Sequence, residues 1–341
     1  MPERVVDLAN EVSDLATDKL QAIERVADQT RMLAINARIQ AAHAGDSGAA
    51  FAVVAQEVGG VATQVRALSE SLAAELAPRI GRIDTLGRDL VEQVPGQRMA
   101  DLALYAIELI DRNLYERSCD VRWWATDSAV VEACADPGDA TKTAFASRRL
   151  GVILDSYTVY LDLWIADARG RVIAAGRPDR HPGVLGADVS AAPWFRKAMA
   201  TADGTEYAVD DITVAPLLGD APVATYATAV RAGGETRGPA IGALGIFFDW
   251  GTQSADVVDG LRLSDAERDR TRCLLLDADG LVIAASDRAG VLTERVALRT
   301  EGRAGGYYSD GETIVGFART PGYETYEGLG WYGALVQAKR R

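Results

Sequence analysis

The N-terminal part of the chain repeats apolar residues at the 3,4 spacing of a helical coiled coil, and one short break divides the repeat. The apolar positions are Leu8, Val12, Leu15, Ala22, Val26 and Leu33 before the break, and Val54, Val58, Val61, Val65, Leu68 and Leu72 after it. The break, Gly45-Asp46-Ser47-Gly48, has the composition of a turn. The pattern predicts an antiparallel helical hairpin over residues 1–93, turning near 45–48, with arms of about 60 Å.

The apolar seam of this hairpin predicts self-association. A lone helix pair leaves much of its seam exposed to water, so we expect a homodimer in which four helices cover it. A hairpin used only as a dimerisation stalk is the alternative.

Pro78 is expected to kink or end the second arm, because proline lacks an N–H and its ring clashes with the preceding turn. Pro95-Gly96 predicts a hinge over 94–97, with a new helix starting at Arg98.

The C-terminal part contains an internal repeat. Residues 164–175 (WIADARGRVIAA) match residues 274–285 (LLLDADGLVIAA), and each copy is an apolar run, an Asp-x-x-Gly turn and a second apolar run. Such a unit predicts a β-hairpin. We therefore expect two similar antiparallel-sheet lobes within residues 98–337, lobe one over about 155–250 and lobe two over about 272–337. With the helical hairpin and the long helix from Arg98, the predicted fold class is α+β.

Composition excludes several classes of function. The formal net charge of −13 argues against a nucleic-acid partner or an anionic membrane surface. Three dispersed cysteines and two histidines favour neither a disulfide framework nor a metal site, and they fit a reducing compartment. No nucleophile–base pair or phosphate-binding glycine loop is evident, so we expect no enzyme activity and no cofactor. The N-terminus lacks an apolar signal segment and no apolar run is long enough to span a bilayer, which predicts a cytoplasmic protein without membrane insertion.

The residues around the turn carry a family resemblance. Gln29-Thr30, Ala34-Ile35-Asn36-Ala37, Ala41-Ala42-His43-Ala44-Gly45 and Phe51-Ala-Val-Val-Ala-Gln-Glu57-Val58 occur together in this order. Together they resemble the membrane-distal tip of methyl-accepting chemotaxis receptors. The resemblance implies that the tip contacts the chemotaxis histidine kinase and its coupling protein. The implied signalling-tip residues are Gln29, Asn36, Gln40, His43, Gly45, Phe51, Val54, Glu57 and Val58.

This tip departs from the family pattern at three positions. Arg31 replaces the usual Asn, Gln40 the usual Glu, and His43 the usual Arg. Receptor tips use that Glu and Arg between neighbouring dimers, and Gln40 with His43 cannot form the same ion pair at neutral pH. Kinase control and trimers of dimers are therefore open for this chain. The arms are also too short for the family's methylation region, so we expect no adaptational methylation.

The helix and the two repeated lobes resemble the double Cache sensor, whose lobes are PAS-like. This resemblance implies a small-molecule ligand in lobe one, bound by Trp194, Phe195, Tyr207, Asp210, Asp211, Tyr226 and Asp249. Amino-acid-binding members place an Arg where this chain has Ala192, so an ordinary α-amino acid is not expected. An amine, a purine-like ring or another small polar metabolite remains open. The alternative interpretation makes Trp194 and Phe195 core residues and gives Asp210 and Asp211 turn roles.

The two resemblances together predict a soluble chemoreceptor-like signal transducer, in which a Cache domain senses a small ligand and the hairpin tip contacts the kinase and coupling protein. The alternative is a dimeric metabolite-binding module or array scaffold without kinase control. The substitutions at Arg31, Gln40 and His43 favour that alternative.

Overall fold

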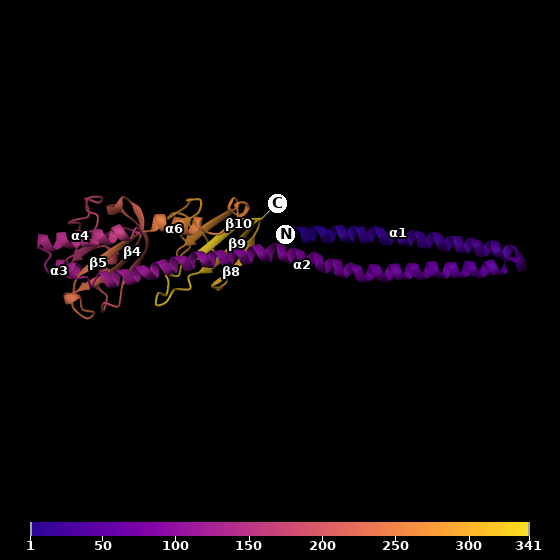
Figure 1. Ribbon diagram of the computed structural model, residues 1–341, viewed down its shortest axis with the longest axis horizontal. Coiled ribbons are helices and arrows are strands. Elements are labelled where there is room, and N and C mark those ends of the chain that lie inside the picture. Colours follow the sequence, from indigo (N-terminus) through magenta and orange to yellow (C-terminus); the bar gives the residue numbers. More distant parts are fainter. Residues whose placement is uncertain (1, 340–341) are drawn as a thin grey trace. The chain divides into compact units, whose positions relative to one another are not determined.

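The computed structural model describes residues 2–339, and it divides into two compact units whose boundary lies between Pro95 and Gly96. The N-terminal unit is a helical hairpin (Figure 1). Helix α1 (Pro2–His43) is followed by a 3₁₀ turn, η1 (Gly45–Gly48), and by helix α2 (Ala49–Trp124). The antiparallel hairpin predicted from the divided repeat is therefore confirmed. No described helix contains a stretch long and apolar enough to cross a membrane.

Helix α2 corrects two expectations about where helices end. Its 76 residues include both Pro78 and Pro95, so neither proline ends the helix. The prediction that a new helix starts at Arg98 is wrong, because α2 continues through this residue. Each proline removes one main-chain hydrogen bond, but the residues that follow Pro95 are held helical by packing, because Met99 and Ala103 are fully buried. The proposed domain limits and the hinge remain predictions.

The C-terminal unit begins on the last part of α2 and adds two short helices before its first sheet. They are α3 (Ser128–Ala135) and α4 (Ala140–Ser156). Each begins at an aspartate N-cap: the side chain of Asp127 accepts a hydrogen bond from the Ala129 N–H, and that of Asp139 from the Thr141 N–H. A carboxylate at this place satisfies free N–H groups of the first turn and interacts favourably with the helix dipole.

Two five-stranded antiparallel sheets follow, one in each lobe. Lobe one contains β1 (Tyr160–Asp167), β2 (Val172–Ala175), α5 (Pro193–Met199), β3 (Ala208–Ala215), η2 (Pro216–Leu218), β4 (Ala221–Arg231), η3 (Ala232–Gly234) and β5 (Ala240–Asp249). Helices α6 (Trp250–Asp259) and α7 (Asp265–Arg268) lead to lobe two. Lobe two contains β6 (Thr271–Leu276), β7 (Val282–Ala285), β8 (Gly305–Asp310), β9 (Thr313–Arg319) and β10 (Tyr332–Ala338).

The two sheets are copies of one topology, which confirms the expected pair of lobes. The strand orders are β2-β1-β5-β4-β3 and β7-β6-β10-β9-β8. The repeated segments also agree in register, since Trp164 pairs with Ala175 and Leu274 with Ala285. In both hairpins the aspartate of the Asp-x-x-Gly turn accepts two main-chain N–H groups, from Arg169 and Arg171 in one case and from the equivalent residues in the other.

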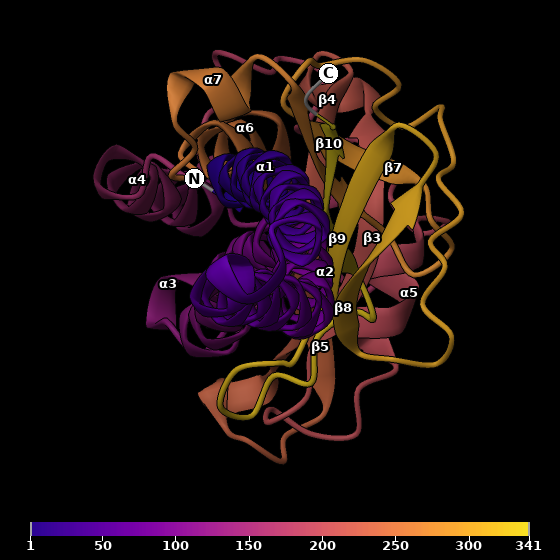
Figure 2. The same ribbon diagram turned by 90° about the vertical axis from the view of Figure 1, so that its right-hand side faces the viewer.

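Each sheet has one face toward α2 and one face away from it. Helices α3 and α4 lie on the α2 side of lobe one, and α5 lies on the opposite side (Figure 2). The α2 sides of both sheets share one large hydrophobic cluster, which includes Ile107, Leu163 and Leu335. The far face of lobe one has its own cluster under α5, and the far face of lobe two is covered by the turns of residues 286–304.

Candidate functional site

The hairpin tip is a tight turn that requires glycine at two positions. Gly45 has a φ of +58°, a left-handed conformation that glycine adopts without strain. Gly48 is buried, and a Cβ there would lie 2.1 Å from the carbonyl oxygen of Ala41. Any side chain at residue 48 would therefore separate the two helices where the chain reverses.

Small residues at heptad spacing form the contact between the two arms. Ala27, Ala34 and Ala41 of α1 and Ala55 and Ala62 of α2 are all buried. We call these five residues, with Gly48, the small-residue seam. They let the helix backbones approach closely, as small interface residues generally do.

Cross-arm contacts fix the register of this seam. A Cβ on Gly59 would lie 3.4 Å from the Cβ of Ala34, so these two residues face each other. Farther from the turn, Arg66 and Asp28 form an ion pair of 3.1 Å between the arms. Both side chains are about half exposed, so this pair guides register more than it adds stability.

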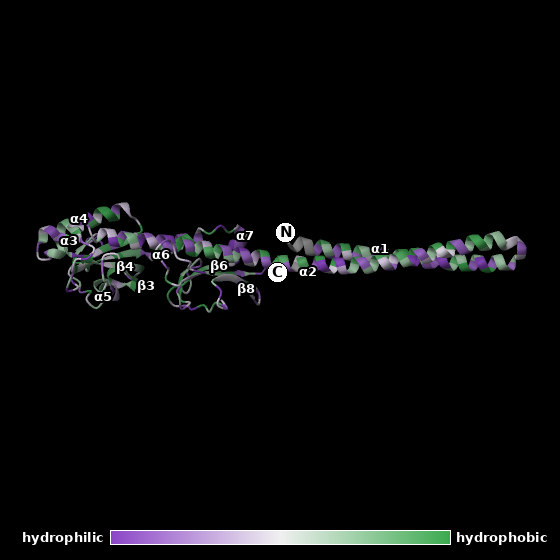
Figure 3. Ribbon diagram, turned by 90° about the horizontal axis from the view of Figure 1, so that it is seen from below, coloured by the Kyte–Doolittle hydropathy of each residue, from purple (hydrophilic) through white to green (hydrophobic). Residues whose placement is uncertain are grey.

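The large apolar residues that the sequence pattern assigned to the seam lie outside it. Leu33 is 68% exposed, Val54 60% and Leu68 72%. Alanine fills the closest approach of the two arms and the large side chains face outward, which agrees with the expectation that a lone helix pair leaves much of this apolar pattern exposed. We call the exposed positions Leu8, Val12, Leu15, Val26, Leu33, Val54, Val58, Val61, Val65, Leu68 and Leu72 the outer stripe. Apolar colouring runs along both arms of the hairpin (Figure 3).

The predicted signalling-tip residues share one property: all nine side-chain positions are exposed. Phe51 is the extreme case at 75% exposure, and Val53 and Ile39 near it are also open to solvent. An apolar ring in water next to polar side chains such as Asn36 and Gln40 is typical of a surface that a protein partner covers. The residues are brought together at one end of the hairpin; their contact with a kinase stays a prediction.

The structure separates the predicted ligand residues of lobe one by sheet face. Trp194 and Phe195 lie in α5 on the far face, where they are 7% and 5% exposed. They pack with Trp164 and Phe247, and the Trp194 and Phe247 rings meet edge to face at 5.8 Å. This packing accords with the alternative interpretation that the two aromatic residues of α5 belong to the core. A role in ligand binding stays a prediction.

Tyr207 and Tyr226 belong to the hydrophobic cluster on the α2 side of the sheet. Their rings stack at 5.9 Å, and Tyr226 is fully buried. The guanidinium carbon of Arg122, from α2, lies 5.4 Å from the centroid of the Tyr207 ring, a cation–π contact. These two tyrosines and the α5 aromatics therefore do not line one common pocket.

The three predicted aspartates have separate partners. Asp210 forms a 2.6 Å ion pair with Lys197, a residue of α5. The ammonium group of Lys197 is therefore turned toward β3, which contains Asp210. Asp211 accepts a hydrogen bond of 3.3 Å from the indole N–H of Trp331. Asp249 caps α6 by accepting from the Thr252 N–H.

Sequence reasoning missed the buried carboxyl groups of this unit. Asp162 has no exposed surface, and it accepts hydrogen bonds from the N–H groups of Leu163, Gly176 and Arg177 and from the indole of Trp164. Burial raises its pKa, although these donors favour the charged form. The signal was present in the sequence, because an aspartate interrupts the otherwise apolar run of β1.

A second buried polar group joins α2 to the same strand. Arg117 is 3% exposed and forms an ion pair of 3.3 Å with Asp120, which accepts a 2.6 Å hydrogen bond from the hydroxyl of Tyr160. The Arg117 guanidinium also lies over the rings of Tyr160 and Phe248. The last turns of α2 are thus tied to lobe one by the Asp120–Tyr160 hydrogen bond and by the contacts of Arg117 with the two rings.

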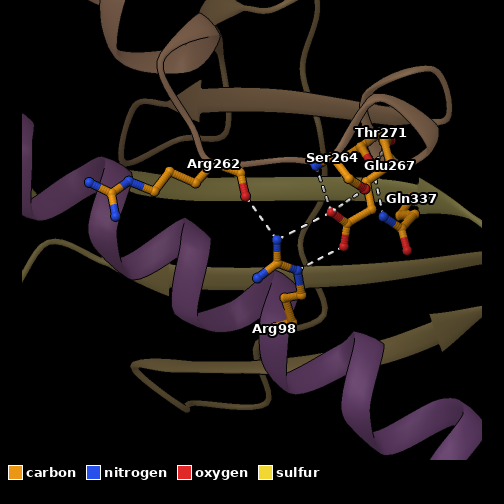
Figure 4. A network of polar contacts seen from close by, with 6 residues as sticks. All are labelled: Arg98, Arg262, Ser264, Glu267, Thr271 and Gln337. Atoms are coloured by element: carbon orange, nitrogen blue, oxygen red, sulfur yellow. Dashed lines mark hydrogen bonds and ion pairs between the residues drawn. The ribbon is translucent and has the colours of Figure 1, made fainter. Parts of the chain in front are cut away.

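Near the start of the same unit, Arg98 of α2 is held by the segment that connects the lobes (Figure 4). Its guanidinium forms an ion pair of 2.7 Å with Glu267 and donates to the carbonyl of Arg262. Glu267 also completes the capping box of α7 with Ser264. The hydrogen bond from Arg98 is the main cause that lowers the pKa of Glu267 to about 2.

Comparison with known proteins gives a sequence match for the hairpin and a fold match for the two-lobed unit. Residues 3–94 match the methyl-accepting chemotaxis protein (MCP) signalling domain. Biofilm dispersion protein BdlA of Pseudomonas aeruginosa is 38% identical over 97 residues, which are 28% of this chain and 22% of that protein. Methyl-accepting chemotaxis protein I of Escherichia coli is 33% identical over 99 residues, 29% of this chain and 18% of that protein. The matched region thus spans about a fifth of the length of these relatives.

Solved structures resemble the chain in fold. The sensory domain of the Campylobacter jejuni chemoreceptor Tlp3 (CcmL) has a TM-score of 0.52 at 14% identity, and the match covers 71% of this chain and 92% of that one. An extracellular ligand binding receptor from Desulfohalobium retbaense has a TM-score of 0.50 at 12% identity, covering 68% of this chain and 39% of that one. The chain therefore joins a hairpin that matches the MCP signalling domain to a two-lobed unit whose fold is like that of these structures, and both expected resemblances are confirmed.

Proposed function

We propose that this protein is a chemoreceptor-like signal transducer whose two-lobed unit senses a small ligand and whose hairpin tip contacts the chemotaxis histidine kinase and its coupling protein. One observation carries the proposal: helix α2 is common to the signalling hairpin and to the sensor fold. A ligand that binds two states of the sensor unequally shifts the population of α2 states, and the hairpin arm is part of that helix. The proposed location is the cytoplasm.

The tip surface supports a protein partner. Phe51 and Val54 present apolar side chains to solvent, and Asn36 and Glu57 supply exposed polar groups on the two facing helices. Buried centres of protein interfaces are commonly built from an aromatic anchor with a polar rim. The outer stripe supports homodimerisation, since a second hairpin covers it in a four-helix bundle.

For the ligand, we propose lobe one as the site and a small polar molecule other than an ordinary α-amino acid as the occupant. Ala192 offers no guanidinium for a carboxylate, and Lys197 is engaged by Asp210. An amine, a purine-like ring or a comparable polar metabolite fits an environment of aromatic and acidic side chains.

The kinase proposal is tested with the full chain in a reconstituted mixture with a chemotaxis kinase and coupling protein. We expect the chain to bind and to change kinase autophosphorylation, and Phe51→Ala to weaken binding by about tenfold because an interface anchor is lost. Leu185→Ala is the matched control, because Leu185 is 46% exposed in a loop of lobe one. Absence of both binding and a change in kinase activity contradicts the proposal.

The tip substitutions favour a second candidate function, an array scaffold or metabolite-binding module without kinase control. Binding without any change of kinase activity in the same assay supports it. Gln40→Glu combined with His43→Arg then provides a sharper test, because this variant restores the charged pair that the resemblance implies. Gain of kinase control in the double variant supports the scaffold interpretation of the natural chain. Thermal shift against amines, purines and carboxylates identifies the ligand, since saturating ligand stabilises the folded state.

A further inference from the structure

The connection between β9 and β10, residues 320–331, carries an inference about how the two lobes communicate. We call this connection the strap. Between its two ends, most strap residues are exposed or half-buried, and only Tyr326 and Trp331 are buried. Residues 321–327 of the strap line an open concavity of about 410 Å³. A segment with few buried residues belongs to the parts of a fold that open most easily.

One end of the strap is anchored on α2. The buried carboxyl group of Asp111 accepts hydrogen bonds from the hydroxyl of Thr320 and from the N–H of Gly322, the latter at 2.8 Å. Next to it, the Tyr323 ring meets Tyr115 of α2 edge to face at 5.4 Å. Gly322 has a φ of +81° and touches the strap's own backbone, so this turn requires glycine.

The other anchors lie on lobe one. Tyr326 is 3% exposed, and its hydroxyl lies 3.3 Å from that of the fully buried Tyr226 in β4. Tyr226 in turn stacks on Tyr207. At the end of the strap, the Trp331 indole donates to Asp211 in β3 at 3.3 Å, and its ring meets Trp250 of α6 at 5.2 Å.

We propose that the strap is a latch that couples lobe one to α2. While Tyr326 and Trp331 are seated against β3 and β4, the strap is held in the one conformation that places Thr320 and Gly322 on Asp111. Loss of the lobe-one anchors releases the α2 anchor, because the residues between them have little packing of their own to keep their shape. The proposal deepens the signalling function proposed above by naming the internal route, but its test does not depend on that function.

The test is hydrogen exchange of strap amides in the full chain, without ligand or kinase. Tyr226→Phe removes only a hydroxyl from lobe one. We expect the Gly322 amide, which is bonded to Asp111, to exchange about five- to tenfold faster, as loss of one hydrogen bond allows. In the reciprocal experiment, Thr320→Val should accelerate exchange at the Tyr326 amide, since coupling between two sites acts in both directions.

Two controls keep the test sharp. Thr325→Ala changes an exposed strap residue between the anchors and should leave both amides unchanged. The double variant Tyr226→Phe with Tyr326→Phe should exchange no faster than either single variant, because both remove the same hydroxyl pair. Effects confined to the neighbourhood of each substitution, with the distant anchor unchanged, would overturn the latch. A silent kinase assay alongside positive exchange results would reject the signalling function and leave the latch intact.

Discussion

Carboxyl groups in this protein are held in two opposite ways. Asp111, Asp120 and Asp162 are buried, and desolvation raises the pKa of each, although all three accept hydrogen bonds. Glu267 is the opposite case, since Arg98 and Ser264 hold its charged form and lower its pKa. A buried carboxyl group with a raised pKa destabilises the fold when it is charged, and this cost disappears as the pH falls toward the ordinary pKa of the group. Glu267 behaves in the opposite way, because its charged form stabilises the fold as the pH rises.

The contribution of Glu267 should therefore disappear in acid. Its folded-state pKa is about 2 against an ordinary 4.5, so its stabilisation is complete above 4.5 and is lost as pH falls toward 2. We expect Glu267→Gln to lower the free energy of unfolding by about 1 kcal/mol near neutral pH, because Arg98 is partly exposed and solvent screens the pair.

Urea unfolding of both proteins at about pH 6 and about pH 3 checks the sign. The difference between them should shrink at the lower pH. A difference that stays constant or grows in acid contradicts the assignment. Asp269→Asn, at an exposed position of the same connecting segment, is the control and should show little difference at either pH.

Among the secondary-structure elements, the hairpin owes its close arm contact to side chains that contribute little area. Ala34 is 4% exposed and faces Gly59 across the seam, and Ala37, one turn away in α1, is exposed. The same chemical change should therefore have different effects at these two positions.

Ala34→Leu should push the arms apart and destabilise the hairpin by about 1–3 kcal/mol, the usual cost of overpacking. Ala37→Leu should change stability by less than about 0.5 kcal/mol, because its side chain points to solvent. Far-UV circular dichroism during thermal unfolding of the full chain compares the two. Equal effects would show that the small-residue seam is not the contact between the arms.

Sequence patterns predicted the elements better than their contacts. The repeat at 164–175 and 274–285 identified two lobes because strand alternation and an Asp-x-x-Gly turn are local properties. Periodicity placed the seam on leucine and valine because hydrophobicity ranks them above alanine, whereas the close approach of two helices selects small residues. Pro95 predicted a helix end, but burial of the following residues outweighed the lost hydrogen bond.

The sequence also predicted the arrangement of the tip residues better than that of the ligand residues in lobe one. The tip residues lie within about 30 positions of one another on a hairpin, so their order along the chain already implies their proximity. Trp194 lies in α5 on one face of the sheet and the Tyr226 side chain of β4 lies on the other face, which a single sequence does not reveal. The pairing of Tyr226 with Tyr326 joins two lobes and carried no signal in a single sequence.

For the molecule as a whole, the exposed apolar side chains of the outer stripe favour association with a second copy of the chain. Leu33 and Leu68 are among its most exposed members. Leu33→Lys combined with Leu68→Lys should weaken the proposed homodimer by at least about tenfold, because two charges would enter an apolar contact. Leu185→Lys, on a loop of lobe one, should leave the dimer constant unchanged. Sedimentation equilibrium measures both, and an unchanged constant in the double variant would place the dimer contact elsewhere.

The small-residue seam also sets how the two arms can move. Interlocking leucines must leave their rotamer wells before one helix can advance along another, but alanine has no χ angle to change. Side-chain interlocking therefore opposes an axial shift of the arms little in the small-residue seam, and the register is held instead by cross-arm contacts such as the Arg66–Asp28 ion pair. The 3₁₀ turn at Gly45–Gly48 keeps the arms joined. Under the proposed signalling function, we expect a small axial displacement of the arms rather than repacking of the hairpin interior.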